Sequence, residues 1–162
     1  MLKYRHVLAA AGLLIFATAP PAAAQSLKDQ LVGTWNLISN TEEYTDGKKV
    51  AWGPDPKGIV MFDAANRFAL QIIVGGRAKA SGNPAENPVG KVIAYFGTYT
   101  TNDAGKELVF QITGASFPNW DGTEQKRVVT GISGSELTYK AIAPIPSGAG
   151  PFVPVLVWSR AK

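Results

Sequence analysis

The sequence predicts an all-β protein, a single antiparallel up-and-down barrel of eight to nine strands with a short helical turn in front of it. Turn signals rich in Gly, Pro, Asn and Asp recur every 8 to 15 residues after residue 25. No long stretch has the apolar spacing of an amphipathic helix. Several segments instead alternate apolar and polar residues, as strands with one buried face do. Consecutive antiparallel strands joined by short loops lose their exposed edges by closing into a barrel.

The expected elements follow one another through residues 25–162. Residues 26–31 form a helical turn capped by Ser26, which covers one end of the barrel. Hairpin-length connections join most of the strands after it. The expected strands are residues 32–43, 48–52, 58–63, 67–74, 91–101, 106–113, 123–132, 135–142 and 152–160.

Two segments are too long and too rich in Gly and Pro for hairpin turns. Residues 75–90 are either a lid or mouth loop of the barrel or an insertion without a role. Residues 143–151 form a second long loop before the last strand. No internal repeat or domain linker interrupts the chain, so we expect one barrel domain over residues 25–162.

Residues 1–24 have the organisation of a secretory signal peptide. Lys3 and Arg5 give a positive start, residues 7–19 are almost wholly apolar, and three alanines precede Gln25. The apolar core is shorter than the roughly 20 residues that a membrane-spanning helix needs. We therefore expect cleavage before Gln25, a periplasmic or secreted product and no stable membrane insertion.

Charge and composition exclude several function classes for the mature chain. Cleavage removes two of the 16 Lys and Arg residues and none of the 12 Asp and Glu residues, which leaves a net charge of +2. So small a charge does not support nucleic-acid binding. The one histidine is His6, and the chain has no cysteine. Histidine- or cysteine-based catalysis and metal sites are thereby excluded, and we expect no cofactor and no metal.

The first and last strands carry a pair that fits barrel closure. Trp35 lies in the first strand and Arg160 ends the last one. Because these strands are neighbours in a closed barrel, Arg160 is expected to lie over the Trp35 ring and close the base. A ligand-binding role for this pair is the less favoured alternative.

Aromatic residues beside Gly and Pro are candidates for a cavity mouth. They lie outside the clearly alternating core faces, where the backbone turns. The alternative is that they fill the barrel interior. The candidates for ligand contact are Trp52, Tyr95, Tyr99, Phe117 and Trp120.

The segment 123–132 places charge on both faces of one strand. If the strand is regular, at least one charged side chain points into the barrel, where it needs a partner or a polar ligand. Arg127 shares a face with Gln125 and is our candidate for orienting a carboxylate or carbonyl, with Glu124 in reserve. A paired ion network, or a β-bulge that turns the charges outward, are the alternatives.

Five short segments together resemble a known family. They are Gly-Thr-Trp at 33–35, Trp-Gly-Pro-Asp-Pro-Lys-Gly at 52–58, Tyr-Phe-Gly-Thr-Tyr at 95–99, Phe-Pro-Asn-Trp at 117–120 and Gly-Thr-Glu-Gln-Lys-Arg at 122–127. This set resembles the bacterial and fungal lipocalin-like domain family over about residues 31–140. The resemblance implies a calycin-type barrel, and it implies the fold more directly than a function.

Three functions remain open at this stage. The favoured one is an exported barrel that binds a small apolar or amphipathic molecule. The second is an isomerase or cyclase without a nucleophile, acting on a polyene or polyketide, in which Tyr95, Tyr99, Glu124 or Arg127 stabilises developing charge. The third is an envelope structural protein with a packed barrel. The ligand and the oligomeric state are left open.

Overall fold

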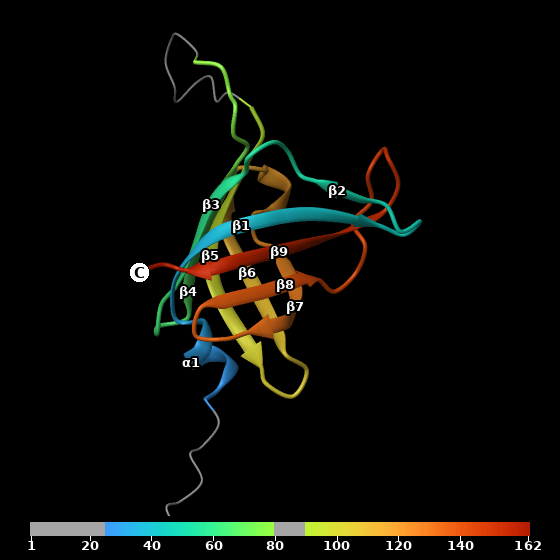
Figure 1. The fold of residues 1–162 in the computed structure, drawn as a ribbon. Coiled ribbons are helices and arrows are strands. Elements are labelled where there is room, and N and C mark those ends of the chain that lie inside the picture. The colour runs from blue at the N-terminus through green and yellow to red at the C-terminus, as the bar shows by residue number, and fades with distance from the viewer. Residues whose placement is uncertain (1–24, 80–89) are drawn as a thin grey trace, which may run out of the picture.

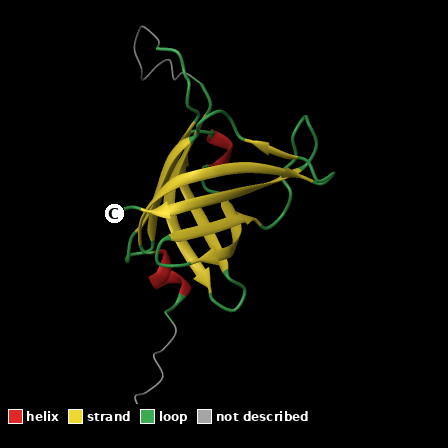
Figure 2. Ribbon diagram, in the orientation of Figure 1, coloured by secondary structure: helices red, strands yellow, loops and turns green. Residues whose placement is uncertain are grey.

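A computed structural model describes residues 25–79 and 90–162, which form nine strands and two short helical segments (Figures 1 and 2). The signal peptide expected at residues 1–24 and most of the loop 75–90 lie outside the described residues. The elements are α1 (Leu27–Leu31), β1 (Gly33–Tyr44), β2 (Lys49–Ala51), β3 (Lys57–Phe62), β4 (Arg67–Ile73), β5 (Val92–Asn102), β6 (Glu107–Ala115), η1 (Pro118–Trp120), β7 (Glu124–Ile132), β8 (Glu136–Ala141) and β9 (Phe152–Arg160).

Eight of the strands close into an antiparallel barrel, as the sequence predicts. Strands β3 to β9 pair in chain order, and β1 joins β3 on one edge and β9 on the other. The extra strand, β2, pairs with Thr41, Glu42 and Glu43 of β1, beyond the part of β1 that pairs with β3. The long β1 therefore pairs with β9 from Trp35 to Tyr44, while its other edge pairs first with β3 and then with β2.

A β-bulge in β1 changes which of its side chains point inward. The pairing with β9 shifts register between Leu37 and Ser39. Before the bulge Trp35 is buried in the interior, and after it Asn40 is buried. An extra residue on one strand reverses the alternation beyond it. The bulge thus places a polar amide inside the barrel where unbroken alternation would place Ser39.

The base of the barrel is closed by α1, whose two leucines are buried beneath the strands. Ser26 caps α1 by accepting a hydrogen bond from the Asp29 amide at 3.1 Å, as expected from the sequence. Figure 2 shows α1 and η1 at opposite ends of the barrel. The end that α1 covers is therefore distinct from the end at which η1 lies.

Arg160 and Trp35 meet at this closed end. The guanidinium carbon of Arg160 lies 4.1 Å from the centroid of the Trp35 ring, a cation–π distance. Its three nitrogens donate to the carbonyl oxygens of Gly134, Val32 and Gln30 at 2.9, 2.9 and 2.6 Å. The fully buried Trp35 donates its indole N–H to the Leu31 carbonyl at 2.8 Å.

Gly33 gives Arg160 the room for these contacts. Its φ of +135° is a conformation that residues with a side chain rarely adopt. A Cβ atom at this position would lie 2.7 Å from a guanidinium nitrogen of Arg160. The glycine two residues before Trp35 is thus required by the arginine that covers the tryptophan ring.

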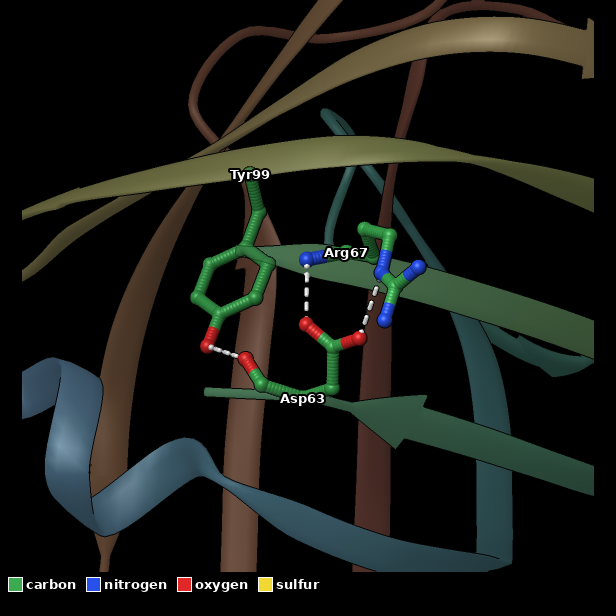
Figure 3. A network of polar contacts seen from close by, with 3 residues as sticks. All are labelled: Asp63, Arg67 and Tyr99. Atoms are coloured by element: carbon green, nitrogen blue, oxygen red, sulfur yellow. Dashed lines mark hydrogen bonds and ion pairs between the residues drawn. The ribbon is translucent and has the colours of Figure 1, made fainter. Parts of the chain in front are cut away.

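Aromatic rings fill the half of the barrel nearer to α1. Phe62 contacts Tyr99 and Phe110 at centroid distances of 5.1 and 6.1 Å, and Phe68 contacts Phe110 at 4.4 Å. The Tyr99 hydroxyl donates to the Asp63 carbonyl at 2.9 Å in the β3–β4 turn (Figure 3). The core is therefore densely packed at the closed end.

The Asp63 side chain holds the same turn together. It accepts hydrogen bonds from the Arg67 amide at 2.8 Å and from the Arg67 guanidinium at 2.6 Å (Figure 3). The Arg67 amide bond, ahead of its side-chain bond and charge, lowers the pKa of the Asp63 carboxyl. None of the described helices is long and apolar enough to span a membrane.

Candidate functional site

A cavity of about 630 Å³ occupies the barrel end opposite α1. Its volume is in the range of small-molecule sites. The loop before β9 contributes to it through Ile145, which also forms a β-bridge with Phe152. Most of the wall is apolar, and the apolar lining residues include Trp52, Ile72, Ile93, Trp120, Ala141, Ile142, Ile145 and Leu156.

Arg127 is the buried cation of this cavity. It lies on the inward face of β7 with Gln125, and only 8% of its surface is exposed. The register shift in β7 falls between Val129 and Gly131, beyond Arg127, so it does not turn the charge outward. The structure thus places Arg127 inside the barrel.

The protein partners of Arg127 are all uncharged. Its Nη1 donates to the Lys126 carbonyl at 2.9 Å, and its Nη2 donates to the Gln125 side-chain oxygen. Its guanidinium carbon lies 5.9 Å from the centroid of the Phe110 ring. Among the described residues no carboxylate lies within ion-pair distance of Arg127, and its Nε has no hydrogen-bond partner. The ion-network alternative therefore does not apply to this arginine.

Two tyrosines adjoin the buried arginine. Burial raises the pKa of the Tyr95 hydroxyl, and the nearby charge of Arg127 partly opposes this effect. Burial also raises the pKa of Tyr139 well above its ordinary value. Both hydroxyls are consequently neutral near pH 7 and are available as hydrogen-bond donors rather than as bases.

Four buried polar atoms without hydrogen-bond partners come from one contiguous part of the barrel wall. Buried polar groups are normally hydrogen-bonded. The four strands that supply them, β7, β8, β9 and β1, are consecutive neighbours in the sheet. Within the described part of the chain, the atoms are Arg127 Nε, the Tyr139 hydroxyl, Trp158 Nε1 and Asn40 Oδ1. Arg127 and Asn40 line the cavity, whereas Tyr139 and Trp158 are not part of its lining. Burial raises the pKa of the Tyr139 hydroxyl, an effect that the Trp158 indole partly opposes.

Asn40 is the second polar side chain that combines deep burial with a place on the cavity wall. It is 4% exposed, and the structure gives its side chain no hydrogen bond to any described residue. An amide in this position offers both a donor and an acceptor to a molecule in the cavity.

The aromatic pair at the mouth is positioned by η1. Trp120 packs edge-on against Tyr95 at a centroid distance of 5.7 Å, and Phe117 packs against Trp120 at 5.6 Å. Pro118 begins the helical turn, and Asp121 accepts a hydrogen bond from the Ala115 amide at 2.8 Å. This turn holds Trp120 over the cavity.

Comparison with known proteins agrees with this architecture. The sequence profile of the lipocalin-like domain matches residues 32–161, which is most of the chain. The chain belongs to the lipocalin-like domain family. No curated protein matches it.

Two solved structures are similar to this lipocalin-like domain. A redesigned β-barrel is 14% identical, with a TM-score of 0.43, and the match covers 84% of this chain and 96% of that one. Bovine odorant-binding protein, in complex with a selenium-containing odorant, is 16% identical with a TM-score of 0.44, and the match covers 90% of this chain and 78% of that one.

The lipocalin-like domain brings five of the seven predicted ligand-contact residues to its cavity. These are Trp52, Tyr95, Trp120, Glu124 and Arg127. Glu124 contributes to the rim only, because its carboxylate pairs with Lys126 at 3.3 Å and accepts a hydrogen bond from Gln111. Its charge is therefore already compensated by residues on the outer face of the barrel.

Two of the predicted contacts are not part of this cavity. Tyr99 lies four residues beyond Tyr95 on the inner face of β5, which places it in the packed half beside Phe62 and the β3–β4 turn. Phe117 is 49% exposed and contacts the outer side of the site through Trp120. Neither residue lines the cavity.

The chemistry available in the lipocalin-like domain is that of binding and charge stabilisation. The guanidinium of Arg127, the Tyr95 side chain, the Asn40 amide and the Glu42 carboxylate line a mostly apolar space. Among residues 25–79 and 90–162, no group of three or more His, Cys, Asp or Glu side chains is arranged to hold a metal ion.

Proposed function

We propose that this lipocalin-like domain binds a small amphipathic molecule inside its barrel and carries or sequesters it. The cavity carries the proposal, because its apolar wall surrounds a few polar groups, headed by the unpaired Arg127. Such a combination gives affinity through the apolar part of a ligand and orientation through its polar part. A cavity of about 630 Å³ also argues against the packed-barrel alternative.

Native mass spectrometry of the protein purified from its own host is the first test. We expect a co-purifying mass that organic extraction releases as an apolar or amphipathic compound. Bare protein that also fails to bind the neutral apolar dye N-phenyl-1-naphthylamine contradicts the proposal.

A cavity-filling variant shows whether the dye binds inside the barrel. Ala141 is buried on the cavity wall, whereas Thr138 faces outward on the same strand. Ala141→Phe should abolish dye binding because the added ring occupies the cavity, and the matched variant Thr138→Phe should bind the dye as the wild type does. Equal binding by both variants shows that the dye lies elsewhere.

We also propose that the domain acts outside the cytoplasm, after removal of residues 1–24. The basic start, the apolar core and the three alanines before Gln25 support this proposal. The intact mass of the protein from its host tests it directly. A product that begins at Gln25 and fractionates outside the cytoplasm is expected, and an uncleaved cytoplasmic product contradicts it.

A second candidate function is isomerisation or cyclisation of the bound molecule. The observation that favours it is the convergence of the Tyr95 hydroxyl and the Arg127 guanidinium, which stabilise negative charge developing on a substrate oxygen. Incubating the extracted compound with the protein and following isomers by chromatography separates the two functions. A carrier returns the compound unchanged, whereas an isomerase gives a product whose formation Tyr95→Phe slows.

A further inference from the structure

We propose that the ligand of this cavity is a monocarboxylate amphiphile that binds head first, with its carboxylate against Arg127 and its apolar tail toward the mouth. This inference rests on the proposed function and specifies the ligand class. It starts from the cost of burying an arginine, which stays charged in proteins. A buried charge is costly unless it is paired, and Arg127 is 8% exposed with only uncharged partners.

No acidic residue of the cavity supplies the missing negative charge. Glu42 lines the cavity, but its carboxylate accepts a hydrogen bond from the Tyr44 hydroxyl at 2.8 Å and lies outside ion-pair distance of Arg127. Glu124 is engaged by Lys126 and Gln111 on the outer face. Arg127 therefore has no ion-pair partner among the described residues and is open to the carboxylate of a bound molecule.

The position of Arg127 gives the orientation of that molecule. The arginine borders the packed core, because its guanidinium lies over the ring of the fully buried Phe110. The exposed apolar side chain of Ile145 lies in the loop before β9, which borders the open end of the cavity. A carboxylate at Arg127 thus leaves the tail of an amphiphile in a cavity whose wall is mostly apolar.

The surroundings of Arg127 favour a single negative charge over two. Lys126 lies next to it in sequence, but its ammonium group is on the outer face of β7 and pairs with Glu124. A dianionic head such as a phosphate monoester would leave one charge uncompensated in the cavity. A planar carboxylate also matches the fork geometry of a guanidinium.

The test is competition against N-phenyl-1-naphthylamine by compounds that share one alkyl chain. Dodecanoate, its methyl ester, dodecanol and dodecyl phosphate are titrated into the wild type, Arg127→Met and Lys140→Met. Arg127→Met removes the buried charge, and Lys140→Met removes an equal charge from the outer face of the neighbouring strand β8. Calorimetric titration with dodecanoate provides a measurement that does not depend on the dye.

The wild type is expected to bind dodecanoate roughly ten- to a hundredfold more tightly than dodecanol or the methyl ester, as charge-assisted hydrogen bonds in a dry site imply. Arg127→Met should lose this preference while its affinity for dye and dodecanol stays within about threefold. Lys140→Met should retain the wild-type preference for dodecanoate. Below the pKa of the fatty acid, the preference should disappear in the wild type as well.

Three outcomes overturn the inference while leaving the proposed function intact: equal binding of dodecanoate and its methyl ester by the wild type, tighter binding of dodecyl phosphate than of dodecanoate, or an equal loss for all compounds in Arg127→Met. The comparison of acid and ester in the wild type stands even if Arg127→Met does not fold. If neither the dye nor any alkyl compound binds and calorimetry shows no heat, the proposed function itself fails.

Discussion

The two ends of the barrel each contain a partly or fully buried arginine, and the two arginines differ in how the protein satisfies them. At the closed end, Arg160 donates to three carbonyl oxygens and lies over the Trp35 ring. At the open end, Arg127 has uncharged partners and a free Nε. A guanidinium that donates from each of its three nitrogens stabilises the fold, whereas one with a nitrogen left unbonded is available to a ligand. The number of hydrogen-bond partners distinguishes a structural arginine from a ligand-binding one better than the exposed fraction of its side chain does.

The largest predicted effect is on the closed end. Arg160→Ala leaves three carbonyls without their donor and removes the cation–π contact, so the free energy of unfolding should fall by about 2–3 kcal/mol. Chemical denaturation measures this change. Dye binding at the open end should stay unchanged, and loss of affinity without loss of stability would reverse the roles assigned to the two arginines.

Trp35→Phe should have a smaller effect at the same end. The variant loses the indole hydrogen bond to the Leu31 carbonyl and part of the ring surface under Arg160, while an aromatic ring remains. We expect the free energy of unfolding to fall by about 1–2 kcal/mol. A value as large as that for Arg160→Ala would mean that ring volume, rather than the arginine, closes the base.

The stability of the protein at alkaline pH tests the burial of two tyrosines near Arg127. The folded-state pKa values of Tyr95 and Tyr139 are raised above 10.0, mainly by burial. The unfolded chain therefore releases these protons first, and stability should be constant below about pH 10 and fall above it, by about 1.4 kcal/mol per pH unit for each tyrosine. Tyr139→Phe should reduce this slope in denaturation curves measured at several pH values. An unchanged slope would show that the pKa of Tyr139 is not raised in the folded protein.

The smallest predicted effect on stability is that of Arg127→Met. Replacing an incompletely satisfied buried charge by an apolar side chain of similar length should leave the free energy of unfolding within about 0.5 kcal/mol of the wild type or raise it. Thermal denaturation of ligand-free protein is the measurement. A fall in the free energy of unfolding as large as that of Arg160→Ala would show that both arginines stabilise the fold.

Most of the fold is visible in the sequence because alternation and turn residues mark strands directly. The strand expected at 67–74 is observed as Arg67–Ile73, and the last strand has the expected bounds 152–160. Arg127 was identifiable because a regular strand carrying Glu124, Lys126 and Arg127 has to point charge inward. These inferences need only local periodicity.

The parts of the site that sequence reasoning missed depend on long-range geometry. Asn40 points inward because of the β1 bulge, and a bulge leaves no mark in the alternation of an already irregular segment. Tyr95 and Tyr99 share one strand face, but only the pairing of the whole sheet tells which of them lies toward the open end.

The pairing of β1 with β9 has a consequence for how the domain folds. Trp35 pairs with Arg160, and Tyr44 pairs with Phe152, so the contacts that close the barrel join segments more than a hundred residues apart. Contacts of such sequence separation slow folding, because a long loop of chain has to be ordered before they form. The barrel closes only when the last strand, Phe152–Arg160, pairs with β8 and β1. Before that step, one edge of β1 and one edge of β8 are exposed and can pair with other chains, which favours aggregation.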